Sequence, residues 1–385
     1  MNISTFQSNL DFFKNLYFHE EWNDEDCRNE ILEAIEEANE RIEKAFGESI
    51  HNLHAHKPSV EAVEKVVKKF PSTLSHVHED DGRIPIQYAA FSDAFEYVPV
   101  LAKEGMKHKV GGEDARGGLL TIDPYEDRGW NTLRLFVKSG AGEEDVERVN
   151  ILKELRKSGM LVKKDIREQE FLSYSCWEDN RARFEYFASW DPDALIDMVH
   201  QIDFRQLSLF FKASFKYHPF TGGLLFEKDD DGIIAFDTMC AGNGTKETMN
   251  ILYEILTPNS DYPILHYVLV NAPQHRELFM EYFPWAYHLK DQNNRTLHQA
   301  VLAAGPDVMN LNKQLFASLS DNRIREKDPV TTLYPFAAMA VGEHADLKNT
   351  FYLLRRNPSV LDRHARARTD HCDLPKRKKK RKRGD

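Results

Sequence analysis

Residues 292–305 read QNNRTLHQAVLAAG, in which a polar turn leads directly into an alanine-rich apolar helix. Asn294 stands where a turn favours a left-handed residue, and His298 lies at the junction of turn and helix. The stretch is either a local chemical site or one copy of a repeated unit. The choice decides the fold class, because a repeated turn and helix predicts stacked units that each pack on their neighbours.

Similar stretches occur elsewhere in the chain. They read EDDGRIPIQYAAF at 79–91, DDDGIIAFDTMCAG at 229–242, YPILHYVLVNA at 262–272 and DPVTTLYPFAAMAVG at 328–342. Small helical residues such as Ala89 and Ala300 would let a neighbouring helix approach closely. Spacings scatter around ~33 residues when the copies are aligned on the apolar residue that opens each helix. Those residues are Ile86, Leu133, Leu172, Leu209, Phe236, Leu265, Leu297 and Leu333.

A second recurring feature is an amphipathic helical run that meets a proline. Pro71, Pro192, Pro284 and Pro358 each follow such a run, and an apolar or aromatic residue comes three positions later. Proline cannot continue a helix, and it pushes the preceding residue out of the helical region. We therefore predict that four helices end just before these prolines.

These stretches resemble degenerate ankyrin repeats. The closest copy to the family pattern is DGRIPIQYAA at 81–90, NRTLHQA at 294–300 lacks the proline, and TLYPFAA at 332–338 is shifted. The helix that ends near 354–361 is similar to the divergent ankyrin-like arrays of diatoms. The resemblance implies an all-α fold, an α-solenoid over residues 49–362 with about 7–8 repeats. The polar, glycine-punctuated stretch near 104–127 predicts a loop inserted between repeats, and residues 1–48 are expected to form an N-terminal helical cap.

The resemblance further implies which residues have structural roles in the repeats. His298 matches the histidine of the family's Thr-Pro-Leu-His tetrapeptide, whose ring makes a hydrogen bond across the turn. We therefore interpret His298 as structural rather than catalytic. The full set of repeat-structural residues is Gly82, Pro85, Ala89, Pro71, Gly232, Pro284, His298, Ala300 and Pro358.

The N-terminal region predicts a helix over residues 23–46. Apolar residues recur there at three-to-four spacing, which predicts one buried stripe, and Gly47 is expected to end the helix. The stripe consists of Ile31, Ala34, Ile35, Ala38, Ile42 and Ala45.

Two stretches invite a metal-binding interpretation. Residues 227–238 approach the spacing of an EF-hand, but Glu227 stands at position one, and Thr238 stands where a bidentate Glu is required. We interpret this stretch as an acidic turn. A histidine-rich patch has a spacing that fits no structural zinc pattern, so a surface cluster is expected. It comprises His51, His54, His56, His76 and His78.

No catalytic or phosphate-binding motif is found in the sequence. Gly111-Gly112 and Gly117-Gly118 punctuate the expected inserted loop without matching any such fingerprint. We therefore expect no enzymatic activity, no cofactor and no metal.

The C-terminal segment has a charge opposite to that of the rest of the chain. Residues 363–385 hold 11 of the 51 Lys/Arg and 3 of the 62 Asp/Glu, which leaves 40 basic and 59 acidic residues before them. A run of like charges repels itself, so we expect a disordered tail. Its core matches a nuclear-import signal, with phosphate binding or solubilisation as rivals. The run is Lys376, Arg377, Lys378, Lys379, Lys380, Arg381, Lys382 and Arg383.

These observations favour a scaffold that binds a protein partner, with an import receptor bound through the tail. The alternative is a nucleic-acid-associated protein whose tail alone contacts phosphates while the array recruits a partner. An acidic body favours a basic partner segment, or the chain's own tail. Four dispersed cysteines indicate reduced thiols, and no signal peptide or membrane span is visible. We expect a monomer in the nucleus or the cytoplasm.

Overall fold

The computed structural model describes residues 25–126, 128–140, 142–177, 180–200, 202–257, 260–317, 326–341, 345–356 and 358. Within these ranges the regular structure is helical apart from three isolated β-bridges, so the all-α prediction is confirmed. No helix among these residues is long and apolar enough to span a membrane. The chain divides into two compact units, Met1–Asp191 and Pro192–Asp385, each described here by itself.

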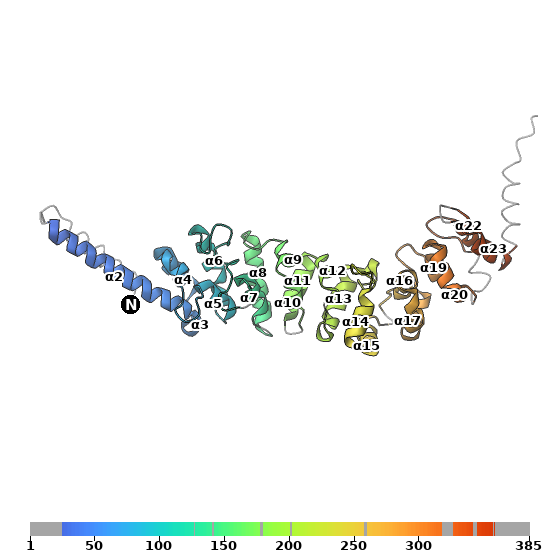
Figure 1. The fold of residues 1–385 in the computed structure, drawn as a ribbon, viewed down its shortest axis with the longest axis horizontal. Coiled ribbons are helices and arrows are strands. Elements are labelled where there is room, and N and C mark those ends of the chain that lie inside the picture. Colours follow the sequence, from blue (N-terminus) through green and yellow to red (C-terminus); the bar gives the residue numbers. More distant parts are fainter. Residues whose placement is uncertain are drawn as a thin grey trace, which may run out of the picture. The chain divides into compact units, whose positions relative to one another are not determined.

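The first unit is built from two rows of helices (Figure 1). One row runs through α5, α7 and α10, in which consecutive helices contact each other, and the other runs through α4, α6, α8 and α11. The elements are α2 (Glu25–His51), α3 (Leu53–His56), α4 (Val60–Lys69), η1 (Pro71–Ser75), α5 (Pro85–Phe91), η2 (Phe95–Tyr97), α6 (Val98–Lys107), α7 (Thr132–Lys138), α8 (Glu144–Lys157), α9 (Asp165–Glu168), α10 (Phe171–Ser175) and α11 (Arg181–Trp190).

The second unit pairs its helices in the same way. Contacts join α14 with α15, α16 with α17, α18 with α19 and α22 with α23, and α16, α18 and α22 follow one another along one row. The elements are α12 (Ala194–Met198), η4 (Phe204–Gln206), α13 (Leu207–Tyr217), η5 (Pro219–Thr221), α14 (Ala235–Asn243), α15 (Thr245–Ile255), α16 (Ile264–Asn271), η6 (Pro273–His275), α17 (Arg276–Tyr282), η7 (Pro284–His288), α18 (Leu297–Ala303), α19 (Pro306–Leu311), α20 (Lys313–Ala317), α22 (Pro335–Ala340) and α23 (Leu347–Arg356).

The predicted proline stops are confirmed. Helices α4, α11, α17 and α23 each end two residues before Pro71, Pro192, Pro284 and Pro358. Before Pro71, Pro192 and Pro284 the preceding residue leaves the helical region, as at Phe70 with φ −126° and ψ 73°. It still donates its N–H to the helix four residues back, so only the direction of the chain changes. Two further stops of this kind, at Pro219 and Pro273, also begin 3-10 turns.

The residues on which the copies were aligned occupy equivalent places in the fold. Seven of the eight lie within the first three residues of a helix and are buried, from Ile86 in α5 to Leu297 in α18. Leu333 instead precedes α22 by two residues and is half-buried. The regular spacing of apolar residues in the sequence thus corresponds to the buried face of each short helix, which packs on neighbouring helices.

Helix α2 does not end where the sequence predicts. It continues through Gly47 to His51. Gly47 lies against the ring of His76, where a Cβ atom would come within 2.5 Å of the ring. The glycine permits close packing inside a helix instead of ending it. The expected buried stripe is also wrong in its described part, since Ala34 and Ala45 are exposed.

The expected loop at 104–127 begins later than predicted and is packed. Helix α6 includes residues 104–107, and the turns after it lie against that helix. A Cβ atom on Gly117, whose φ is +68°, would lie 2.0 Å from the carbonyl oxygen of Ala102. Val110 and Leu119 are buried, so this segment contributes to the core of the first unit.

Candidate interaction surface

The turn before α18 is folded around one carboxylate. Asp291 Oδ1 accepts the backbone N–H groups of Asn293 and Arg295, both at 2.8 Å. An antiparallel bridge between Lys290 and Thr296 closes the turn. A short aspartate side chain suits this task because it can accept a bond from the backbone a few residues later. The same kind of bond, to an N–H two to four residues on, is made by Asp81, Asp123, Asp229 and Asp328.

A glutamine in the first turn of α18 links that helix to the following turn of the chain. Gln299 Oε1 accepts the N–H of Thr296 at 2.8 Å, and its Nε2 donates to the carbonyl oxygen of Lys327 at 2.9 Å. Gln87 does the same in α5, with the N–H of Ile84 at 2.9 Å and the carbonyl oxygen of Ile122 at 3.0 Å. One side chain therefore caps its own helix and fixes the next turn against it.

An arginine at the end of each of these two turns makes a second link to the turn that follows. Arg83 Nε lies 2.8 Å from Asp123 Oδ2, and Arg295 Nε lies 2.7 Å from Asp328 Oδ1. Burial alone would raise the pKa of the Asp328 carboxyl, but hydrogen bonds from Arg295 and Thr331 outweigh it and hold that pKa well below its usual range. The pair is therefore ionised at neutral pH, and each turn is held by charge as well as by the glutamine.

Replacing Asp123 by asparagine should destabilise the first unit by about 2 kcal/mol. The Asp123 side chain is fully buried, and Asp123→Asn leaves the Arg83 guanidinium with only the more distant carboxylate of Asp81, at 3.8 Å, while keeping an oxygen for the N–H of Tyr125. Urea titration of the full chain measures the change. Asp80→Asn, at an exposed position of the preceding turn, is the matched control and should stay within about 0.5 kcal/mol of wild type. Equal stability of the two variants would contradict the role assigned to this ion pair.

The residues predicted as repeat-structural lie in turns, at helix starts and in buried helix positions. Gly82 and Gly232 are turn residues with φ of +73° and +78°. Pro85, Ala89 and Ala300 are buried, and Pro85 is the first residue of α5. Pro71 and Pro284 each open a 3-10 turn after a helix, and Pro358 is exposed in a turn beyond α23.

His298 lies in α18 and is only 4% exposed. Its Nε2 is 3.3 Å from the hydroxyl of Tyr287, and its ring packs edge-on against Tyr287 and Phe316. A second histidine, which the sequence analysis did not single out, connects to the next turn: His266 Nε2 donates to the carbonyl oxygen of Arg295 at 3.1 Å. The sequence did contain a signal for this role, because Leu265-His266 repeats the Leu-His dipeptide found at 297–298.

A shallow groove runs between the turns and the first helices of the second unit. It consists of one hollow of about 300 Å³ over α16 and α18 and another of about 230 Å³ over α18 and α22. Arg295 and Ala303 line both hollows, so they adjoin. We call this surface the turn groove. Its lining includes the small side chains Ala300 and Ala303 of α18 and both members of the Arg295–Asp328 pair.

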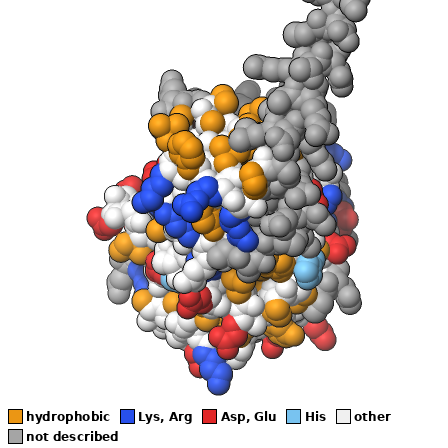
Figure 2. Space-filling model, turned by 90° about the vertical axis from the view of Figure 1, so that its right-hand side faces the viewer, with side chains coloured by type: hydrophobic (Ala, Val, Ile, Leu, Met, Phe, Trp, Pro, Cys, Tyr) orange, Lys and Arg blue, Asp and Glu red, His pale blue; other side chains and the backbone are white. Residues whose placement is uncertain are grey.

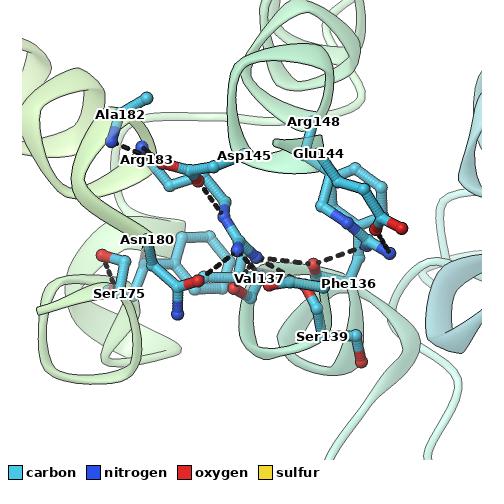
Figure 3. A network of polar contacts seen from close by, with 12 residues as sticks. Phe136, Val137, Ser139, Glu144, Asp145, Arg148, Ser175, Asn180, Ala182 and Arg183 are labelled. Carbon is cyan, nitrogen blue, oxygen red and sulfur yellow. Dashed lines mark hydrogen bonds and ion pairs between the residues drawn. The ribbon is translucent and has the colours of Figure 1, made fainter. Parts of the chain in front are cut away.

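Two buried arginines hold the second row of helices to the first in the first unit (Figure 3). Arg183 of α11 is fully buried and donates to the carbonyl oxygens of Ser139 and Gly140, beyond the end of α7, and to the carboxylate of Asp145. These carbonyls would otherwise lack partners at the helix end. Arg183 of α11 thus caps the C-terminal end of α7, which belongs to the preceding helix pair.

Arg148 of α8 repeats this arrangement one helix pair earlier. It is 1% exposed and donates to the carbonyl oxygens of Ala90 and Ser92, at the end of α5, and to that of Phe136. Burial and the nearby charge of Arg183 lower the pKa of Arg148 to about 10, so it stays charged at neutral pH. Neither arginine was predicted from the sequence.

The histidine-rich patch is split by the structure. His51 is buried, and its Nε2 lies 3.2 Å from His76 Nδ1, whereas His54 and His56 are exposed. The ring of His51 also contacts those of His78 and Tyr88. No group of three side chains suited to hold a metal ion occurs among the residues that the structure describes. The patch is therefore a packed junction between α2 and the elements after it.

The predicted import signal at 376–383 lies outside the described residues. The comparisons with known proteins add no identification: no protein-family model matches the chain, and neither the curated proteins nor the solved structures contain a match.

Proposed function

We propose that this chain is a non-enzymatic, ankyrin-like α-solenoid that binds a protein partner through its turn groove. The repeated link from one turn to the next carries the proposal. Arg83 and Gln87 in the first unit, and Arg295 and Gln299 in the second, make the same pair of bonds to the following turn. Helix pairs stacked in this way support a surface of turns and first helices for recognition, as in repeat proteins generally. In this proposal the N-terminal helical segment caps the array.

Ala303→Arg tests whether the turn groove binds the partner. Ala303 is exposed on α18 and lines both hollows, so an arginine there would fill the place where they meet. Proteins cross-linked to the full chain in living cells should be lost from this variant. Ala34→Arg, at an exposed position of α2, should keep them. Recovery of the same proteins by both variants would place binding elsewhere.

We also propose that the basic run at 376–383 directs the chain to the nucleus. The test compares the full chain with a full-length variant in which all eight cations are replaced by glutamine, each fused to a fluorescent protein. Nuclear accumulation of the wild type alone supports an import signal. The same distribution for both would contradict it.

A nucleic-acid-associated role is the second candidate, in which the basic tail alone contacts phosphates and the folded part recruits a partner. Figure 2 looks onto the α22–α23 end of the second unit, where Lys and Arg side chains gather beside hydrophobic ones. Helix α23 carries the exposed Lys348 and Arg355, and its Leu347 and Phe351 are 69% and 63% exposed. RNA and DNA binding that falls steeply with salt, and that glutamine replacement of the tail abolishes, would favour this candidate.

A further inference from the structure

A further hollow on the second unit lies apart from the turn groove and has three aromatic side chains among its lining residues. It measures about 420 Å³ and lies between α15, α17 and η7. None of its lining residues is shared with the turn groove. We call it the aromatic pocket, and it is lined by Asn250, Tyr253, Glu281, Tyr282, Pro284 and Trp285.

One buried ring supports two of the pocket's aromatic side chains. Phe283 is fully buried, and its ring centroid lies 6.2 Å from that of Tyr253 and 6.1 Å from that of Trp285. The Trp285 ring stands at 86° to Phe283, whereas the Tyr253 ring is inclined by 34°. The two rings therefore do not lie parallel. Because α15 and the turn after α17 both pack on Phe283, the pocket exists before any ligand arrives.

The polar part of the pocket is negative. Glu281 is exposed at the end of α17 and makes no ion pair with any residue that the structure describes. Asn250 adds an uncharged amide, and no lysine or arginine lines the hollow. The faces of Tyr and Trp rings attract cations through their quadrupole, and an adjacent carboxylate adds to that attraction.

We propose that the aromatic pocket binds the ammonium group of a lysine side chain in a basic protein segment. Ring faces would surround the charged end, and Glu281 would supply the counter-charge. The proposal deepens the proposed function, on which it rests, by giving the partner a chemistry. The lysine has two sources, a partner protein or the chain's own run at 376–383, and both present the same group.

The test uses the purified full chain and a fluorescent peptide of nine residues that contains one lysine among glycines and serines. Glu281→Gln and Tyr253→Leu should each weaken the peptide's affinity about fivefold, the effect of one cation–π contact or one partly exposed charge pair. Glu277→Gln removes the same charge one turn earlier in α17, at a position 84% exposed. Phe351→Leu removes an aromatic ring that is 63% exposed in the same unit and lines neither the aromatic pocket nor the turn groove. Both controls should stay within about twofold of wild type.

Two further arms identify the ligand chemistry and its source. The same peptide with its lysine acetylated should lose affinity about fivefold on wild type, because acetylation removes the charge. In the full chain whose 376–383 cations are glutamine, tighter peptide binding than in wild type would identify the tail as the resident ligand. Equal binding would assign the site to a partner.

Equal weakening by all four substitutions, or no measurable binding in either tail background, would overturn the proposal. The readout needs neither nuclear import nor a cellular partner. Failure of the turn-groove test with Ala303→Arg therefore leaves this result unaffected, and the two failures can be told apart.

Discussion

Replacing Arg183 by methionine should lower the free energy of unfolding of the first unit by about 3–5 kcal/mol, the usual effect of breaking a buried ion pair. Arg183→Met leaves the carboxylate of Asp145, itself only 3% exposed, without its charged partner. It also removes the donors from the carbonyl oxygens of Val137, Ser139 and Gly140. Each buried acceptor left unpaired adds to the loss.

Arg183→Lys should recover little of this stability. A guanidinium donates in several fixed directions at once, whereas an ammonium on a flexible stem cannot reach the same set of carbonyls. Urea titration followed by tryptophan fluorescence reports mainly on this unit, because four of the chain's five tryptophans lie within residues 1–191. Arg181→Met is the control two residues earlier, where an exposed pair with Glu185 should contribute less than about 1 kcal/mol. A loss as small for Arg183→Met as for this control would contradict the structural role of the network.

The sequence predicted the four helix ends at prolines correctly because their cause is local. Proline restricts its own backbone and that of the residue before it, whatever the rest of the fold does. The same holds for the turns, where Asp291 bonds to N–H groups within four residues of itself. The apolar residue near the start of each short helix, from Ile86 to Leu297, was also recognisable from the sequence. Each of these residues is buried because its helix packs against neighbouring helices.

What the sequence did not reveal depends on contacts between distant residues. Arg183 sits in the run RARFEYFAS beside Arg181, and no local feature distinguishes the fully buried arginine from the exposed one. Gly47 was interpreted as a helix end because its reason for being glycine, His76, lies in another segment. The helix through Gly47 shows that a glycine can serve close approach as well as termination.

Of the two candidate sites, the turn groove depends on local sequence features and the aromatic pocket depends on contacts between distant residues. The turn groove follows from the repeated turns, so its position was predictable once those turns were recognised. The aromatic pocket joins Tyr253 of α15 to Trp285 of η7, and both rings depend on the buried Phe283 between them. Only the packing of α15 against the end of α17 brings these residues together. No periodic pattern in the sequence predicts that contact.

Acidification should loosen the junction between α2 and the rest of the first unit. Burial, and the like charges that His76 and His78 would carry, lower the pKa of His51 to about 4. Asp81 acts in the opposite direction, and Tyr88 packs its ring on His51 without adding charge. His51 is therefore neutral when folded at neutral pH, while the same residue in the unfolded chain titrates near 6.5.

The sign of the effect follows from these two pKa values. Above pH 6.5 both states are neutral at His51 and the junction has its full stability. Between pH 6.5 and about 4, His51 is protonated in the unfolded chain but stays neutral in the folded chain. The free energy of unfolding therefore falls as the pH is lowered. The loss is complete below about pH 4 and amounts to about 3 kcal/mol, since each unit of pKa difference is worth about 1.4 kcal/mol.

Unfolding of the full chain in urea at pH 7.5, 6.5, 5.5 and 4.5 measures this loss, and substitution isolates the part that belongs to His51. His51→Gln removes the titrating group, so its stability should fall less than that of wild type across the window, although it starts lower because a packed ring is lost. His54→Gln changes an exposed histidine three residues later and should retain the wild-type slope. Parallel pH profiles for wild type and His51→Gln would show that the buried neutral ring is not the origin of the acid sensitivity. A shallower profile for His51→Gln alone would establish the histidine junction as the acid-labile contact of α2.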